Sequence, residues 1–182
     1  MNIFLTSYGI DTRHMEYVKG YKKIIQKLNG LKVAIIPNAR LKTQNRNSAI
    51  NIFNELKKNN INSKLVDIDT EKFNIKEYDA IYFTGGEPKY LMDSIYNANL
   101  FYEIKDFINN NGIIIGQSAG AMIFCKDYLD TSTGKLKILH NGFDYTNKII
   151  VPHYNNLNKD ILDNLPDNII AINDNDNLIE LQ

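Results

Sequence analysis

Apolar residues occur along the chain in short continuous runs, each of which stops at small or polar residues. Runs of four to seven residues without polar alternation are typical of strands that are buried on both faces of a parallel sheet. Such runs predict strands at residues 2–7, 32–38, 64–68, 80–86, 112–117, 148–154 and 168–173.

Between these runs, apolar residues recur every three or four positions, which is the spacing of an amphipathic helix. The predicted helices cover residues 12–28, 47–60, 91–108 with a break near Asn97, 119–128, and a short stretch around 160–165. In the second helix, the apolar face is predicted from Ile50, Ile52, Phe53 and Leu56. Strands that alternate with helices predict an α/β fold, a three-layer α/β/α sandwich with a mostly parallel sheet, in one domain over residues 1–182.

Ligands of such sheets bind beyond the carboxyl ends of the strands, so the residues that follow each run are the first candidates for a functional site. These are Ser7-Tyr8, Asn38-Ala39, Gly85-Gly86-Glu87, Gln117-Ser118-Ala119 and His153-Tyr154.

Ser118 stands between Gly116 and Gly120, where a buried run stops and a helical pattern begins. Gly-x-Ser-x-Gly in that setting predicts a nucleophile elbow, in which a tight turn exposes the serine hydroxyl and the glycines avoid collisions that a Cβ would make. The alternative interpretation is an ordinary tight turn whose serine caps the helix.

A serine nucleophile needs a base, and the base needs an orienting acid. Of the three histidines, His14 falls in the first predicted helix and His140 precedes a turn signal, whereas His153 lies where an apolar run reaches the surface. For the acid, Asp174 directly follows the last apolar run, and Asp176 is the alternative two residues later.

The segments "YFTGGEPKYLMDSI", "GIIIGQSAGAMI", "IVPHYNN" and "IIAINDNDNLIE" resemble, in this order, the conserved blocks of the peptidase E (aspartyl dipeptidase) and cyanophycinase family of serine peptidases. The opening "MNIFLTS" and "VAIIPNA" also resemble the first two strands of that family, so the resemblance covers nearly the whole chain. It implies a class I glutamine amidotransferase-like, flavodoxin-like fold and a serine peptidase that acts on small peptides in the manner of a dipeptidase.

The resemblance implies Ser118 as nucleophile, His153 as base and Asp174 as acid, at a position where relatives usually carry Glu. It also implies an oxyanion hole from the backbone N–H groups of Gly86 and Ala119. Further candidates for substrate contact are Glu87, Gln117 and Tyr154.

Two features depart from the family pattern. Glu87 follows the Gly-Gly pair where relatives usually have Asn. An aspartyl dipeptidase holds its substrate's side-chain carboxylate with a cation, yet the segment after His153 contains Lys159 and no Arg.

Three other functions remain open at the level of the sequence. A degenerate relative would bind a peptide without hydrolysing it. A small esterase or amidase of the α/β-hydrolase type would use the order serine, acid, histidine, which Asp144 and His153 satisfy. A glutaminase would need Cys at the position of Ser118, and Cys125 is instead predicted as a packed residue on the following helix.

Charge and composition limit the kinds of partner and compartment that we expect for the protein. The chain has 21 basic and 21 acidic residues, so we expect no nucleic-acid partner. It has one cysteine, which permits no disulfide within the chain. We expect no signal peptide and no membrane span, since no apolar run approaches ~20 residues. The sequence therefore predicts a cytoplasmic monomer or homodimer that takes a small peptide substrate and needs no cofactor or metal.

Overall fold

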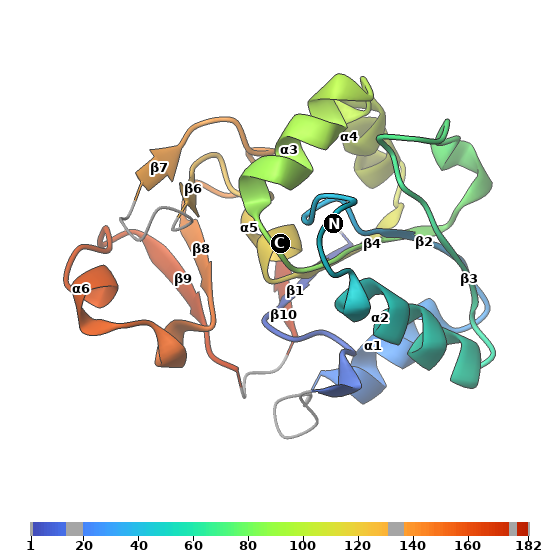
Figure 1. Ribbon diagram of the computed structural model, residues 1–182, viewed down its shortest axis with the longest axis horizontal. Helices are drawn as coiled ribbons and strands as arrows, with labels where there is room; N and C mark the ends of the chain where they lie inside the picture. Colours follow the sequence, from blue (N-terminus) through green and yellow to red (C-terminus); the bar gives the residue numbers. More distant parts are fainter. Residues whose placement is uncertain (1, 14–19, 131–136, 175–177, 182) are drawn as a thin grey trace.

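A six-stranded sheet forms the centre of the protein (Figure 1). The computed structural model describes residues 2–13, 20–130, 137–174 and 178–181. The strand order is β10-β1-β5-β4-β2-β3; β10 runs antiparallel to β1, and the other neighbours are parallel. The strands are β1 (Ile3–Thr6), β2 (Lys32–Ile36), β3 (Asn62–Leu65), β4 (Ala80–Phe83), β5 (Ile113–Gln117) and β10 (Ile179–Leu181).

Helices cover both faces of this sheet because successive strand residues point to opposite sides. Phe4, Val33 and Tyr82 pack in one cluster with α1 (Tyr21–Leu28) and α2 (Asn47–Lys58). Strand residues that point the other way, such as Leu5 and Phe83, pack in a second cluster with three other helices. Those helices are α3 (Pro88–Asn97), α4 (Phe101–Asn109) and α5 (Ala119–Met122). The predicted mostly parallel α/β fold with helices on both faces is confirmed.

The register brings the carboxyl ends of three strands to one edge of the sheet. Thr6 of β1 pairs with Gln117 of β5, and Phe83 of β4 pairs with Gly116. Ser118 therefore leaves the sheet at the same edge as the loops that follow β1 and β4.

A second, smaller region lies beside the central sheet, at the left of Figure 1. In it, β8 (Ile149–Pro152) and β9 (Ile169–Ile172) form a two-stranded parallel sheet, with η3 (Tyr154–Asn156) and α6 (Lys159–Leu162) in the connection. A short antiparallel pair, β6 (Tyr128–Asp130) and β7 (Lys137–Leu139), adjoins it. Because apolar runs do not specify their pairing partners, the sequence did not separate β8 and β9 from the central sheet.

Several predicted boundaries were wrong. The helix expected over residues 119–128 ends at Met122, since the chain then turns so that Cys125 bridges to Thr146. Ile123, Phe124 and Cys125 are all fully buried, so their apolar character carries no helical period. Cys125 is thus a packed residue, as predicted, but it does not lie on the helix.

Other elements shifted or were missed. The third strand ends at Leu65, so its predicted range of 64–68 was displaced toward the C-terminus. Ile50 is half exposed, and Ala49 takes its expected place on the buried face of α2. Within the described part of the first predicted helix, α1 begins only at Tyr21. The short strands β6, β7 and β10 were not predicted, whereas the break near Asn97 is confirmed by the end of α3 there.

None of the helices in the described ranges has both the length and the apolar character that crossing a bilayer requires.

Candidate active site

Ser118 occupies a strained turn between β5 and α5. Its backbone has φ 51° and ψ −114°, a combination that a non-glycine residue rarely adopts. The turn is held because the Ser118 N–H donates to the Thr6 carbonyl at 2.9 Å, and the Ser118 carbonyl accepts from the Ala121 N–H at 2.8 Å. The strained backbone is therefore fixed by the strand on one side and the helix on the other.

The two flanking glycines are required by close backbone approaches. A Cβ on Gly116 would lie 2.5 Å from the Gly120 carbonyl oxygen, and a Cβ on Gly120 would lie 2.3 Å from that of Phe83. Neither backbone oxygen has room to move, since both belong to packed elements. The structure thus contains the close backbone approaches that the sequence predicted at both glycines.

His153 comes from the smaller region and meets Ser118 across the gap between the two sheets. Its Nε2 lies 3.0 Å from Ser118 Oγ. Its backbone is left-handed, with φ 56°, and its N–H donates to Ser7 Oγ at 3.0 Å. Ser7 in turn donates to the Ile172 carbonyl at 3.0 Å, and the Tyr8 ring packs edge-on against the imidazole at 4.7 Å. The loop after β1 thereby holds the histidine in place.

Asp174 is buried two residues after the end of β9, with its carboxylate against the imidazole. Asp174 Oδ1 lies 2.6 Å from His153 Nδ1. Asn156 donates its side-chain amide to the other carboxylate oxygen, and the Asp174 N–H donates to Asn155 Oδ1 at 2.8 Å. An aspartate thus reaches the histidine without the extra methylene of a glutamate. Asp176 lies outside the described residues.

The competing candidates lie elsewhere or outside the described residues. His140 is exposed and pairs with Asp127 at 2.9 Å. Asp144 is exposed, while the imidazole nitrogen that it would serve is bonded to Asp174. Burial raises the pKa of the Cys125 thiol to about 11, which keeps it protonated. His14 belongs to the residues that are not described.

The loop after β4 lies against Ser118. A Cβ on Gly85 would approach the Ser118 Cβ to 3.2 Å, and one on Gly86, where φ is 150°, would lie 2.2 Å from the Ala39 carbonyl oxygen. Ala119 is the first residue of α5, and the first N–H groups of a helix have no partner within it. The oxyanion-hole role of Gly86 and Ala119 stays a prediction that this arrangement permits.

Two cavities meet at Ser118 and differ in character. One, of about 120 Å³, is lined by polar and charged groups that include Asp11, Arg13 and Arg40. The other, of about 210 Å³, is lined mainly by apolar side chains and carries Glu87. A larger hollow of about 870 Å³ lies between η2 (Ile75–Glu77) and α4, and no residue of the Ser118 site lines it.

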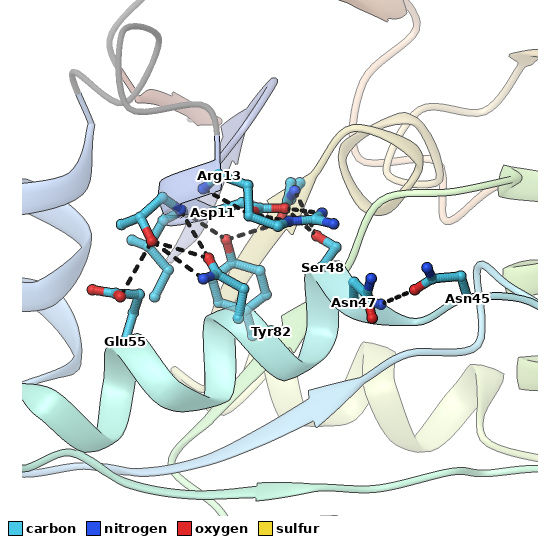
Figure 2. Close-up of polar contacts among 11 residues, drawn as sticks. Asp11, Arg13, Asn45, Asn47, Ser48, Glu55 and Tyr82 are labelled. Atoms are coloured by element: carbon cyan, nitrogen blue, oxygen red, sulfur yellow. Dashed lines mark hydrogen bonds and ion pairs between the residues drawn. The ribbon is translucent and has the colours of Figure 1, made fainter.

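A network of polar side chains lines the first cavity and extends from it to Tyr82 (Figure 2). Gln117 accepts from the Tyr82 hydroxyl at 3.1 Å and donates to Ser48 Oγ at 3.3 Å. Ser48 donates to Asp11 at 2.7 Å, and Arg13 donates to both oxygens of the same carboxylate. Gln117 is therefore engaged at both ends of its amide, and its predicted contact with substrate stays a prediction.

Two carboxylates of the site have displaced pKa values. Burial alone would raise the pKa of Asp11, but hydrogen bonds from Arg13 and Ser48 outweigh it and hold that pKa below its ordinary value. Burial, and then repulsion from Asp130, raise the pKa of Glu87, which Arg40 partly offsets.

The remaining predicted residue, Tyr154, packs against the small apolar cluster of Leu129, Ile149 and Val151. It lines neither cavity beside Ser118 in the described part of the chain, and its substrate contact stays a prediction. Sequence reasoning did not assign roles to Asn155 and Asn156. Both lie in the same segment as His153, residues 150–156, but nothing in that segment distinguishes them from ordinary loop residues.

Among the described residues, no three His, Cys, Asp or Glu side chains gather in a cluster that could hold a metal ion.

The sequence profile of Peptidase family S51 matches residues 3–182. The chain belongs to Peptidase family S51. As a member of that family it is a serine-type peptidase. No curated protein sequence matches this S51 peptidase.

Solved structures share the fold of this S51 peptidase. A protein of Listeria monocytogenes EGD-e that has been assigned as a peptidase E superposes with a TM-score of 0.71 at 22% identity, over 95% of this chain and 90% of that one. A peptidase from an acI-B1 Actinobacterium superposes with a TM-score of 0.63 at 21% identity, over 91% of this chain and 72% of that one. At these identities the likeness establishes the fold.

Proposed function

We propose that this S51 peptidase hydrolyses small peptides, in the manner of a dipeptidase, through an acyl-enzyme on Ser118. The observation that carries the proposal is the unbroken row of hydrogen bonds from Ser118 Oγ through His153 to Asp174, at 3.0 and 2.6 Å. These distances lie within the range required for proton transfer between a nucleophile and its base.

In the proposed reaction, His153 Nε2 accepts the Ser118 proton as Oγ attacks the scissile carbonyl carbon. The carbonyl oxygen becomes an oxyanion, which the N–H groups of Gly86 and Ala119 stabilise. The imidazolium then gives its proton to the leaving amine, and the C–N bond breaks. A water molecule repeats the sequence on the ester, with His153 as base, and releases the acid product.

Asp174 holds the imidazole in the tautomer that leaves Nε2 free to accept a proton. Its buried carboxylate also stabilises the imidazolium that forms in each step. The second oxygen of that carboxylate is bonded to Asn156, so the acid has a fixed orientation toward His153.

The size of the two cavities supports a small substrate. Volumes of about 120 and 210 Å³ suit single residues on either side of the scissile bond. A dipeptide fits this arrangement, and the polar cavity with its two arginines suits the carboxylate of the leaving residue.

A fluorophosphonate probe tests the proposal, because it phosphonylates a serine only when a base activates the hydroxyl. We expect one adduct, on the peptide that contains Ser118. Ser118→Ala should remove it, while Ser63→Ala, at a serine of β3, should leave it unchanged. An adduct that persists in Ser118→Ala contradicts the assignment. No adduct in the wild type would favour a degenerate relative that binds peptides without hydrolysing them.

A further inference from the structure

The apolar cavity beside Ser118 is built by both regions of the protein. Its apolar lining comes from α5, β6, β8 and the segment that contains α6, through Met122, Leu129, Val151, Leu157 and Ile161. Leu129 and Val151 belong to a small apolar cluster that is distinct from the two clusters of the central sheet. The cavity is thus an opening in that small cluster which reaches the reacting hydroxyl.

The residues at its inner end are those of the reaction. Gly86, Ser118 and His153 all line it. A side chain that enters the cavity can therefore belong to a residue that flanks the scissile bond. An apolar cavity of about 150 Å³ accommodates a benzene-sized group. The volume here, about 210 Å³, is sufficient for a large aliphatic or an aromatic side chain.

Glu87 gives the cavity lining a negative charge at the point where the loop after β4 enters α3. Among the described residues, no lysine or arginine lines the cavity. Burial and then repulsion from Asp130 raise the pKa of Glu87, and Arg40 offsets part of this rise. An aspartate or glutamate side chain in this cavity would lose its hydration and meet a carboxylate in place of a cation.

The two cavities also differ in which end of a dipeptide they suit. The leaving residue of a dipeptide carries an α-carboxylate, and the polar cavity offers Arg13 and Arg40. Within the described ranges Arg40 forms no ion pair, whereas Arg13 is already paired with Asp11. The acyl residue carries a free α-ammonium group, for which the Glu87 carboxylate is complementary. In this arrangement the side chain of the acyl residue lies in the apolar cavity.

We propose that the apolar cavity is the pocket for the acyl residue, and that this peptidase selects a large apolar side chain there and rejects acidic ones. The proposal rests on Ser118 being the nucleophile, as set out under the proposed function. It gives that site a substrate class: peptides with an apolar residue on the acyl side of the scissile bond.

Aminoacyl p-nitroanilides test the pocket because the leaving group stays constant. Leucine and methionine anilides should exceed the alanine anilide by about 30-fold in kcat/KM, from the burial of the additional carbons. They should exceed the aspartate anilide by about 100-fold or more. A flat series, or a preference for aspartate, overturns the proposal.

A matched pair of variants on α6 locates the effect. Ile161→Phe fills the cavity and should lower the leucine-to-alanine ratio by about 10-fold. Leu162→Phe, at the next position of the same helix but outside the cavity lining, should leave the ratio unchanged. Should Ile161→Phe fail to fold, Ile161→Ala enlarges the cavity and is expected to favour the phenylalanine anilide over the leucine anilide. Equal effects at the two positions contradict the pocket assignment.

Glu87→Gln tests the charge. It should raise the aspartate-to-leucine ratio by about 10-fold, because one carboxylate repulsion is removed at short range. A contact between Glu87 and the α-ammonium group of the substrate does not change the aspartate-to-leucine ratio, since both anilides carry that group. An unchanged ratio shows that Glu87 plays no part in the selection and overturns that part of the proposal.

Two further measurements separate this inference from the proposed function. In an Ala-X dipeptide series, a preference for apolar X with a flat anilide series would assign the cavity to the leaving residue and overturn the proposal. Labelling of Ser118 by a small fluorophosphonate does not depend on the acyl pocket. Ser118 that is labelled in an enzyme without apolar preference contradicts the inference alone, whereas Ser118 that is not labelled contradicts the proposed function.

Discussion

The two regions of the molecule contribute to the site in different ways. The central sheet supplies Ser118 at the end of β5, on a backbone fixed by hydrogen bonds to β1 and by the close packing of Gly116 and Gly120. The smaller sheet supplies His153 and Asp174 from the ends of β8 and β9, where polar side chains hold the geometry. Backbone hydrogen bonds and close packing position the proposed nucleophile, whereas side-chain hydrogen bonds position the proposed base and acid.

This difference predicts that substitutions in the two regions have different effects. A substitution near Ser118 forces backbone atoms apart and so affects the fold. A substitution among the polar groups around His153 leaves the apolar packing intact and affects the orientation of the imidazole. Ser7 connects the two regions, because it accepts from the His153 N–H and donates to the Ile172 carbonyl.

The largest expected effect is that of removing the proposed base. His153→Ala should lower kcat by on the order of 10⁶-fold, as found for the base of a triad that acts as a unit. His140→Ala is the matched control and should be close to wild type, since His140 is exposed and bonds to Asp127. Steady-state turnover of a leucine anilide measures both. A greater loss at His140 would contradict the account.

Asp174→Asn should come next, with a loss of about 10⁴-fold in kcat, because an amide leaves the imidazole in the wrong tautomer. Asp176→Asn should have a small effect, since the imidazole Nδ1 already has Asp174 as its partner at 2.6 Å. The same turnover assay compares them. If Asp176→Asn is the more damaging variant, the acid has been assigned to the wrong residue.

Asn156→Ala should have a smaller effect, about 10-fold on kcat with little change in KM, because it loosens the acid without removing it. Asn164→Ala, at an exposed asparagine that follows α6, should match the wild type. The thermal midpoint of both variants should stay near that of the wild type. A loss of stability in step with the loss of rate would indicate a role in the fold instead.

Substitutions in the polar network of Asp11, Ser48 and Gln117 should change the stability of the protein more than its rate of turnover. The depressed pKa of Asp11 means that its stabilising contribution is complete above its unfolded-state pKa and is lost as the pH falls through its folded-state pKa. Asp11→Asn should cost about 1 to 3 kcal/mol at neutral pH, since Arg13 and Ser48 lose a charged acceptor. Urea unfolding at several pH values measures this. A variant whose unfolding free energy falls with acid as steeply as that of the wild type would show that Asp11 does not carry the dependence.

The same contrast explains what the sequence could predict. Ser118 was identifiable because its glycines and the apolar run before it are local features, and local packing holds it. His153 and Asp174 were found from the ends of apolar runs and from the resemblance. The separate pairing of β8 with β9 was not foreseen, since pairing depends on distant parts of the chain.

The residues that hold the candidate site residues in place were harder to predict. Nothing in the pattern around Asn155 and Asn156 distinguishes them from solvated loop residues, because their function depends on Asp174 approaching from another strand. The network from Tyr82 through Gln117 to Ser48 joins three elements that are far apart in sequence. Hydrogen bonds between residues far apart in the chain leave no periodic pattern in the sequence, so they could not be predicted from it.

The defining intermediate of the proposed reaction is an acyl group on Ser118, formed under the control of His153 and Asp174. The most direct measurement is mass spectrometry of the enzyme after rapid acid quench from an activated leucine ester, with peptide mapping of the adduct. We expect the leucyl group on the peptide that contains Ser118, and we expect it to build up in a burst before steady turnover. Turnover without any acyl adduct, or with the adduct on another residue, would contradict it.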